Sequence, residues 1–135
     1  MEVAPTILVV DDSENDVLLL LRALEQEGVS NPVHVCKSGD EALKYLVAHS
    51  LRLPRLMLLD VKMPGMDGFE VLRIVKNSPT WRQVITVVLT TSVLHEDEEA
   101  AYVLGADAFR TKPVGNDALR DMIRNFPKQW LHCNE

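Results

Sequence analysis

The sequence predicts a single α/β domain, built as a doubly wound parallel sheet of five strands with five flanking helices. Short apolar runs alternate along the chain with stretches of helical spacing, and this alternation occurs five times. Such alternation with short connections favours a parallel sheet that has helices on both faces. A chain of 135 residues is long enough for one domain with a real core and too short for two ordinary ones.

The expected strands are short, continuous apolar runs. Strands of parallel sheets are covered on both faces, so they lack the alternation of polar and apolar residues seen in half-exposed sheets. Runs of this kind occupy residues 6–10, 33–36, 56–59, 85–89 and 108–110.

The expected helices follow from capping residues and from apolar spacing. Ser13 to Asp16 and Ser38 to Glu41 have the pattern of capping boxes, in which a serine and an acid three residues later satisfy the first backbone N–H groups. Glycine is typical of the position just after a helix. The remaining predicted signals are Gly28 after the first helix, Asp67 before the third, Asp97 to Leu104 as the fourth with Gly105 after it, and Asn116 as the cap of the fifth.

Charged residues follow three of the expected strands. Asp11 and Asp12 come after the first, Asp60 after the third, and Lys112 after the fifth. Because parallel strands bring their carboxyl ends to one edge of a sheet, these side chains should converge. Clustered acids raise one another's pKa, and a divalent cation relieves the repulsion. An all-oxygen ligand set suits Mg²⁺ better than zinc.

Simpler interpretations exist for these residues. Carboxylates favour the positive end of a helix, so Asp11 or Asp12 could act only as a cap. Ser13 already supplies that cap, and Asp67 is better placed than Asp60 to cap the third helix. Three other residues have ordinary alternatives, namely Lys112 as a surface lysine, Thr90 as the end of a strand and Phe109 as a core aromatic.

Composition excludes several classes of protein. The net charge is −6 and no basic patch appears, which argues against nucleic-acid binding. No apolar run approaches the length of a membrane span, and acidic residues interrupt the first apolar run too early for a signal peptide. Cys36 and Cys133 fit a reduced cytoplasmic compartment better than a disulfide framework.

Taken together, the motifs resemble the receiver domain of two-component response regulators. Each motif is weak alone, but four of them in this order, each at a strand end, are highly specific. They are Val9-Val10-Asp11-Asp12-Ser13, Leu58-Leu59-Asp60-Val61-Lys62-Met63-Pro64-Gly65-Met66-Asp67-Gly68, Val88-Leu89-Thr90-Thr91-Ser92, and Gly105-Ala106-Asp107-Ala108-Phe109 with Lys112-Pro113.

The resemblance implies a strand order of 2-1-3-4-5 and a phosphorylation switch rather than an enzyme with a free substrate. It makes Asp60 the phosphoacceptor, with the Lys112 ammonium and the Thr90 hydroxyl binding the phosphoryl group and Phe109 acting with Thr90 as the switch. Mg²⁺ would be bound by Asp12, by Asp60 and by the backbone carbonyl of Lys62, with Asp11 acting through a metal-bound water. The bond before Pro113 is often cis in this family.

The resemblance also implies partners. The phosphoryl donor would be a sensor histidine kinase, and similarity to single-domain regulators associated with bacterial phytochromes suggests a kinase of that type. We expect residues 1–135 to form one receiver domain with a short aromatic tail and no effector domain, so that output is by protein interaction. Exposed Phe126, Trp130 and Leu131 would favour a homodimer through the fourth and fifth helices and the tail. In the alternative, Pro127 turns the tail back onto its own domain.

Three other functions are alternatives to that of a receiver. One is a degenerate receiver that serves as a docking module independent of phosphorylation. A phosphatase with an aspartyl nucleophile would need an acid two residues after Asp60, where Lys62 stands. A flavin-binding module would need a phosphate loop after the first strand, where Asp11 and Asp12 would repel a phosphate.

Overall fold

The five strands form one parallel sheet in the order β2-β1-β3-β4-β5, as predicted. The computed structural model describes residues 4–63, 65–91 and 94–133. In sheet order the strands are β2 (Val33–Cys36), β1 (Ile7–Val10), β3 (Leu56–Leu59), β4 (Ile85–Thr90) and β5 (Ala108–Thr111). No helix in these described ranges is long and apolar enough to cross a bilayer.

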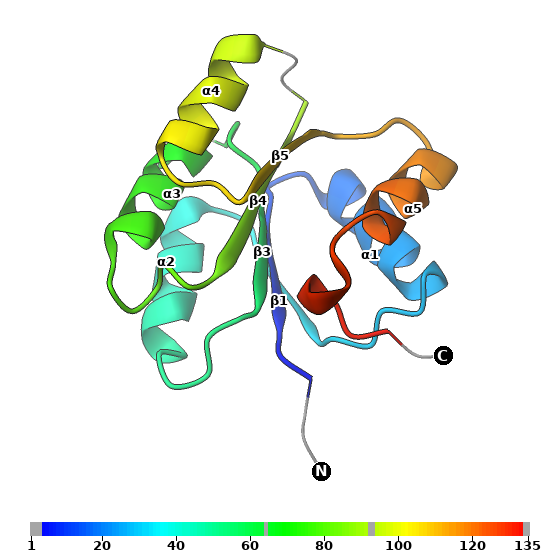
Figure 1. Ribbon diagram of the computed structural model, residues 1–135, viewed down its shortest axis with the longest axis horizontal. Coiled ribbons are helices and arrows are strands. Elements are labelled where there is room, and N and C mark those ends of the chain that lie inside the picture. Colours follow the sequence, from blue (N-terminus) through cyan, green and yellow to red (C-terminus); the bar gives the residue numbers. More distant parts are fainter. Residues whose placement is uncertain (1–3, 64, 92–93, 134–135) are drawn as a thin grey trace.

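The helices cover both faces of the sheet (Figure 1). One face carries α1 (Glu14–Gln26) and α5 (Asn116–Arg124), and the other carries α2 (Gly39–Ala48), α3 (Gly68–Asn77) and α4 (His95–Val103). Successive side chains of a strand point to opposite faces. Ile7 and Val9 of β1 therefore pack under α1 and α5, while Leu8 and Val10 pack under the helices opposite.

Capping residues position the first three helices as the sequence predicted. The side chains of Ser13, Ser38 and Asp67 each accept a hydrogen bond from the backbone N–H three residues later. At the other two helices the predicted starts were wrong. Helix α4 begins at His95, two residues before the predicted Asp97, because Leu94 occupies the N-cap position. Asn116 is the first residue of α5 rather than its cap, and Gly115 stands at the N-cap with a φ of 92°.

The C-terminal tail packs on its own domain. After Pro127 the chain forms a short 3₁₀ turn, Lys128–Trp130, and the rings of Phe126 and Trp130 lie 5.5 Å apart. Phe126 is buried, and Trp130 packs against the core beneath α1 and α5. The prediction that these aromatic side chains are exposed was therefore wrong, and the alternative in which Pro127 turns the tail back is the one observed.

Hydrogen bonds fix the tail at the edge of the sheet opposite the strand ends that carry the acids. The backbone N–H of His132 donates to the side-chain oxygen of Asn31 over 2.6 Å, and the backbone N–H of Ser30 donates to the carbonyl of His132 over 2.7 Å. Arg55 donates to the carbonyl of Gln129 over 2.7 Å. The tail is thus held by hydrogen bonds to the segments that precede β2 and β3.

Candidate functional site

Three carboxylates meet at the carboxyl edge of the sheet. Asp11 and Asp60 follow the neighbouring strands β1 and β3, whose last residues are register partners, so the fold places the two acids side by side. Side-chain oxygens of Asp11, Asp12 and Asp60 all lie within 4.8 Å of one another. Asp11 and Asp60 are buried, whereas Asp12 is exposed. We refer to these residues as the acidic trio.

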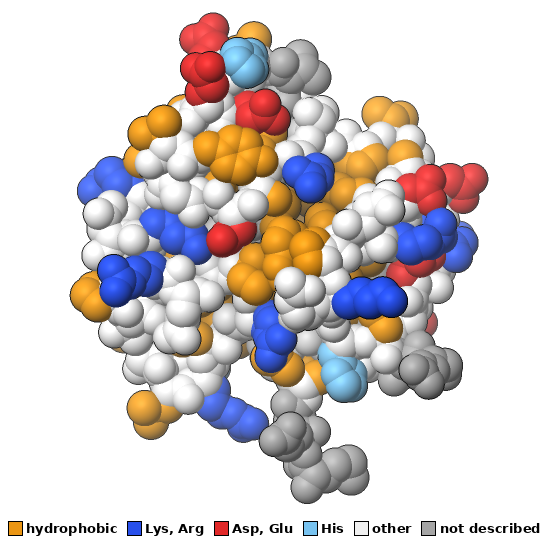
Figure 2. Space-filling model, in the orientation of Figure 1, with side chains coloured by type: hydrophobic (Ala, Val, Ile, Leu, Met, Phe, Trp, Pro, Cys, Tyr) orange, Lys and Arg blue, Asp and Glu red, His pale blue; other side chains and the backbone are white. Residues whose placement is uncertain are grey.

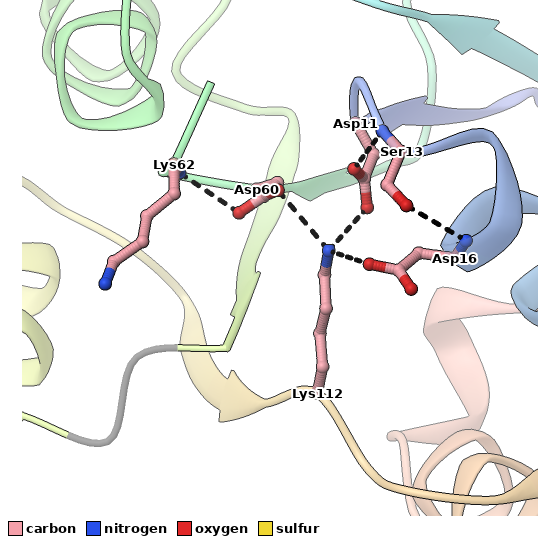
Figure 3. A network of polar contacts seen from close by, with 6 residues as sticks. All are labelled: Asp11, Ser13, Asp16, Asp60, Lys62 and Lys112. Atoms are coloured by element: carbon pink, nitrogen blue, oxygen red, sulfur yellow. Dashed lines mark hydrogen bonds and ion pairs between the residues drawn. The ribbon is translucent and has the colours of Figure 1, made fainter. Parts of the chain in front are cut away.

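Asp60 is a buried carboxylate whose negative charge is partly balanced by nearby donors. Burial raises its pKa, and the negative charge of Asp11 acts in the same direction. The backbone N–H of Lys62, which donates to Asp60 over 3.1 Å, and the ammonium of Lys112 oppose this shift. The side chain of Lys62 is exposed and points away from the cluster (Figure 3).

Lys112 connects the acids of the site (Figure 3). Its Nζ lies 2.8 Å from a carboxylate oxygen of Asp11, 2.8 Å from one of Asp16 and 3.3 Å from one of Asp60. Burial alone would lower the pKa of Lys112, but the hydrogen bonds to Asp11 and Asp16 outweigh burial and raise it. The ammonium is therefore charged, and its three carboxylate partners hold it beside Asp60.

Asp16 was missed as a member of this site. The sequence pattern places Asp16 as the last residue of a capping box, and its backbone N–H does donate to the Ser13 hydroxyl over 3.3 Å. Its side chain, however, turns toward Lys112. The first turn of a helix that follows a parallel strand lies over the carboxyl edge of the sheet, and this rule could have identified Asp16.

Thr90 and Phe109 lie on the neighbouring strands β4 and β5, and β4 is next to β3 in the sheet. Thr90 is the last residue of β4 and is fully buried, and its carbonyl accepts a hydrogen bond from the backbone N–H of Lys112 over 2.7 Å. Phe109 is also buried, and its backbone N–H donates to the hydroxyl of Tyr102 on α4 over 3.1 Å. The peptide bonds of the described residues are all trans, so the cis bond suggested before Pro113 is not observed.

The donors of the acidic trio fit a hard divalent cation. All are carboxylate oxygens, two of the three acids are buried, and Lys112 is the cation that contacts two of them. One ammonium leaves the trio with net negative charge, which a cation of high charge density would neutralise. The geometry therefore agrees with Mg²⁺, and it brings together Asp11, Asp12, Asp60 and Lys112 as the sequence predicted.

Comparison with known proteins identifies the family. The model of the response regulator receiver domain matches residues 7–124. The chain belongs to the response regulator receiver family. Receiver domains are phosphorylation switches of two-component signalling and bind Mg²⁺ at their acidic pocket, so the acidic trio of this receiver corresponds to that pocket.

Relatives of the receiver differ in overall length. It is 34% identical over 131 residues to the probable methanogenesis regulatory protein FilR2 of Methanothrix harundinacea, with 95% of this chain and 84% of FilR2 covered. It is 38% identical over 129 residues to the response regulator PleD of Caulobacter vibrioides, but that match covers 96% of this chain and 27% of PleD. The receiver thus spans most of one relative and about a quarter of the other.

Two crystal structures are similar to the receiver. One is of a phytochrome response regulator, and the other contains bound Mn²⁺. The phosphorylated cyanobacterial phytochrome response regulator RcpA has a TM-score of 0.84 at 32% identity, with 94% of each chain covered. The Mn²⁺-bound form of response regulator Rcp1 has a TM-score of 0.82 at 30% identity, also with 94% of each chain covered. These similarities confirm the receiver fold.

Proposed function

We propose that Asp60 is the phosphoacceptor of this receiver and that a sensor histidine kinase of the phytochrome type is its donor. The observation that carries the proposal is the position of Asp60, a buried carboxylate within the acidic trio with the Lys112 ammonium 3.3 Å away. Similarity to the phytochrome response regulator RcpA supports the kinase type. A cytoplasmic location fits such a partner.

The chemistry is an in-line transfer of a phosphoryl group. A carboxylate oxygen of Asp60 attacks phosphorus, the new P–O bond forms, and the P–N bond to the kinase histidine breaks as the imidazole leaves. The Lys112 ammonium pairs with an oxygen of the incoming group, and the Thr90 hydroxyl donates to another. Water later cleaves the acyl phosphate and resets Asp60, so the receiver acts on its own phosphoryl group and on no free substrate.

Mg²⁺ would be bound by Asp12, Asp60 and the backbone carbonyl of Lys62, with Asp11 acting through a water. The cation supplies charge neutralisation at the phosphoryl oxygens. Asp12 is the exposed member of the acidic trio and the one that makes no contact with Lys112 among the ion pairs of the described residues. Its carboxylate is therefore the one most available to a metal.

Phosphorylation would be read by another protein at α4, β5 and α5. The added charge draws Thr90 and Lys112 toward Asp60, and Phe109 transmits the change to α4 through its hydrogen bond with Tyr102. Figure 2 shows hydrophobic side chains gathered between α4 and α5 on this side of the molecule, with acidic side chains at the outer end of α4. A homodimer through this surface stays a prediction, and the packed tail is not expected to drive it.

The test uses beryllofluoride, a phosphoryl mimic, together with Mg²⁺. We expect it to raise the melting temperature of the wild type and to give a bound ¹⁹F signal. Asp60→Asn should lose both effects while keeping its fold, because the change is nearly isosteric. Asp40→Asn is the matched control, since Asp40 is an exposed aspartate of α2 that pairs with Lys44, and it should behave like the wild type. Equal binding by Asp60→Asn would refute the assignment, and the docking-module alternative predicts no binding by any of the proteins.

A further inference from the structure

The Lys112 ammonium is fully engaged before any phosphoryl group arrives. A lysine ammonium has three N–H donors, and here three carboxylates accept them, at 2.8 Å (Asp11), 2.8 Å (Asp16) and 3.3 Å (Asp60). The contact with Asp60 is the longest of the three. On phosphorylation the donor that faces Asp60 would turn to a phosphoryl oxygen, and the ammonium can move closer to that oxygen only if its contact with Asp11 or Asp16 lengthens.

Asp16 is the carboxylate that can be released at the lowest cost. Its side chain is 37% exposed, whereas those of Asp11 and Asp60 are 9% and 7% exposed. Water can solvate the Asp16 carboxylate once the ammonium leaves, but a buried carboxylate left without its partner would bear a desolvation penalty. Asp16 therefore loses less than Asp11 when Lys112 moves.

The backbone of Asp16 is held by local structure, independently of Lys112. Its backbone N–H is capped by the Ser13 hydroxyl, and Ser13 is itself held by a hydrogen bond from its backbone N–H to Asp11 over 2.9 Å. A small cavity of about 40 Å³ lies beside these groups and is lined by Asp11, Asp16 and Lys112 together with apolar side chains. The ammonium thus has a defined resting position beside Asp11 and Asp16.

We propose that Asp16 is a positioning residue that holds Lys112 in its resting place and competes with the phosphoryl group for it. This rests on the proposed role of Asp60 and adds a residue outside the acidic trio to the control of the switch. Asp16 sets the balance between the resting and phosphorylated states, because each must bind the same ammonium. The negative charge of Asp16 also favours the resting state, because it repels a further anion nearby.

The test compares the affinity for beryllofluoride, in saturating Mg²⁺, of the wild type, Asp16→Asn, Asp16→Glu and Glu14→Gln. Glu14→Gln is the matched control because it removes one negative charge from the same helical turn, but Glu14 pairs with Lys37 rather than Lys112. Asp16→Asn keeps the backbone cap, so α1 should stay folded. We expect Asp16→Asn to bind about 3- to 10-fold more tightly than Glu14→Gln, in line with the loss of one partly exposed, charge-assisted hydrogen bond.

Two further readouts distinguish positioning from structural support. Asp16→Glu should restore the affinity toward that of the wild type. In the metal-free protein, the ¹⁵N signal of the Lys112 ammonium should shift in Asp16→Asn and stay unchanged in Glu14→Gln. A purely structural role for Asp16 would weaken binding in Asp16→Asn, and either that result or an affinity equal to Glu14→Gln overturns the proposal. Absence of binding by the wild type would instead refute the role of Asp60.

Discussion

The two helices that flank the edge strand β5 are attached to the domain in different ways. Helix α5 buries Leu119 and Ile123 against the sheet and is tied to α1 through Glu27, which binds the guanidinium groups of Arg120 and Arg124 over 2.7–3.0 Å. All nine residues of α4 are described, and Ala101 alone among them is buried. Its outward residues Tyr102 and Val103 are 47% and 84% exposed.

This difference indicates which part of the receiver can move cheaply. Segments with few buried apolar contacts open at low free energy, whereas well-packed elements open only with the whole fold. The N-cap residue of α4, Leu94, makes no side-chain cap hydrogen bond, and the contact of α4 with β5 includes a hydrogen bond between Tyr102 and Phe109. The site lies between an anchored element, α1 with α5, and a loosely held one, α4. A local change at Asp60 should therefore displace α4 first.

The largest loss of stability should come from a substitution in the buried face of α5. Ile123→Ala removes a side chain that is 2% exposed and leaves a cavity, so we expect the free energy of unfolding to fall by about 2–5 kcal/mol. Val103→Ala on α4 changes a side chain that is 84% exposed and should stay within about 0.5 kcal/mol of the wild type. Urea denaturation measures both. Similar losses for the two variants would show that α4 is as firmly anchored as α5.

A smaller, pH-dependent effect is expected at Glu27. Hydrogen bonds from Arg124 and then Arg120 lower the pKa of Glu27 from 4.5 to about 2. Because the pKa of Glu27 is lower in the folded protein than in the unfolded chain, its ionised carboxylate stabilises the fold. This stabilisation is complete above pH 4.5 and is lost as the pH falls toward 2. The wild type should therefore be more stable than Glu27→Gln at neutral pH, and the difference should shrink as the solution is acidified.

Denaturation midpoints across this pH range test the attachment of α5 to α1. Glu25→Gln is a suitable control, because Glu25 is an exposed acid near the end of the same helix. A stability difference between wild type and Glu27→Gln that is independent of pH would mean that the arginine pairs do not secure α5.

The smallest change in stability is expected when the hydrogen bond between α4 and β5 is removed. Tyr102→Phe removes the hydroxyl that accepts the N–H of Phe109, a net loss of about 0.5–1.5 kcal/mol at most. Hydrogen exchange should report it more clearly than global stability, because the Phe109 amide loses its partner while the amides of α5 do not. Unchanged exchange at Phe109, measured against the amides of Ile123 and Leu119, would remove Tyr102 from the route to α4.

The strands and most of the site could be predicted because local sequence determines them. Buried parallel strands have continuous apolar runs, and an acid directly after such a run has only the carboxyl edge of the sheet to occupy. Asp11, Asp12, Asp60 and Lys112 were found in this way. The start of α4 was predicted less well, because the sequence offers acids at several successive positions and no decisive cap.

Features that depend on tertiary packing could not be predicted. The tail has helical spacing up to Trp130, but the helix ends before Pro127 and the aromatic rings turn inward. The direction in which the rings turn depends on the space available beneath α1 and α5. The role of Asp16 depends likewise on the direction in which the Lys112 side chain extends. From sequence alone, Asp16 could either belong only to the helix cap or also form an ion pair with a lysine.

One glycine has a consequence for how this site can vary. Gly68, the first residue of α3, lies so close to the loop after β3 that an added Cβ would clash with the backbone oxygen of Asp60 and with the Cα of Val61. Its N–H also donates to the carbonyl of Val61 over 3.2 Å. The main chain that carries Asp60 is therefore held in place by backbone contacts with the start of α3 and with β1. Side chains around Asp60 can therefore be exchanged, and the proposed phosphoryl chemistry at Asp60 altered, while its main chain stays at the same point in space.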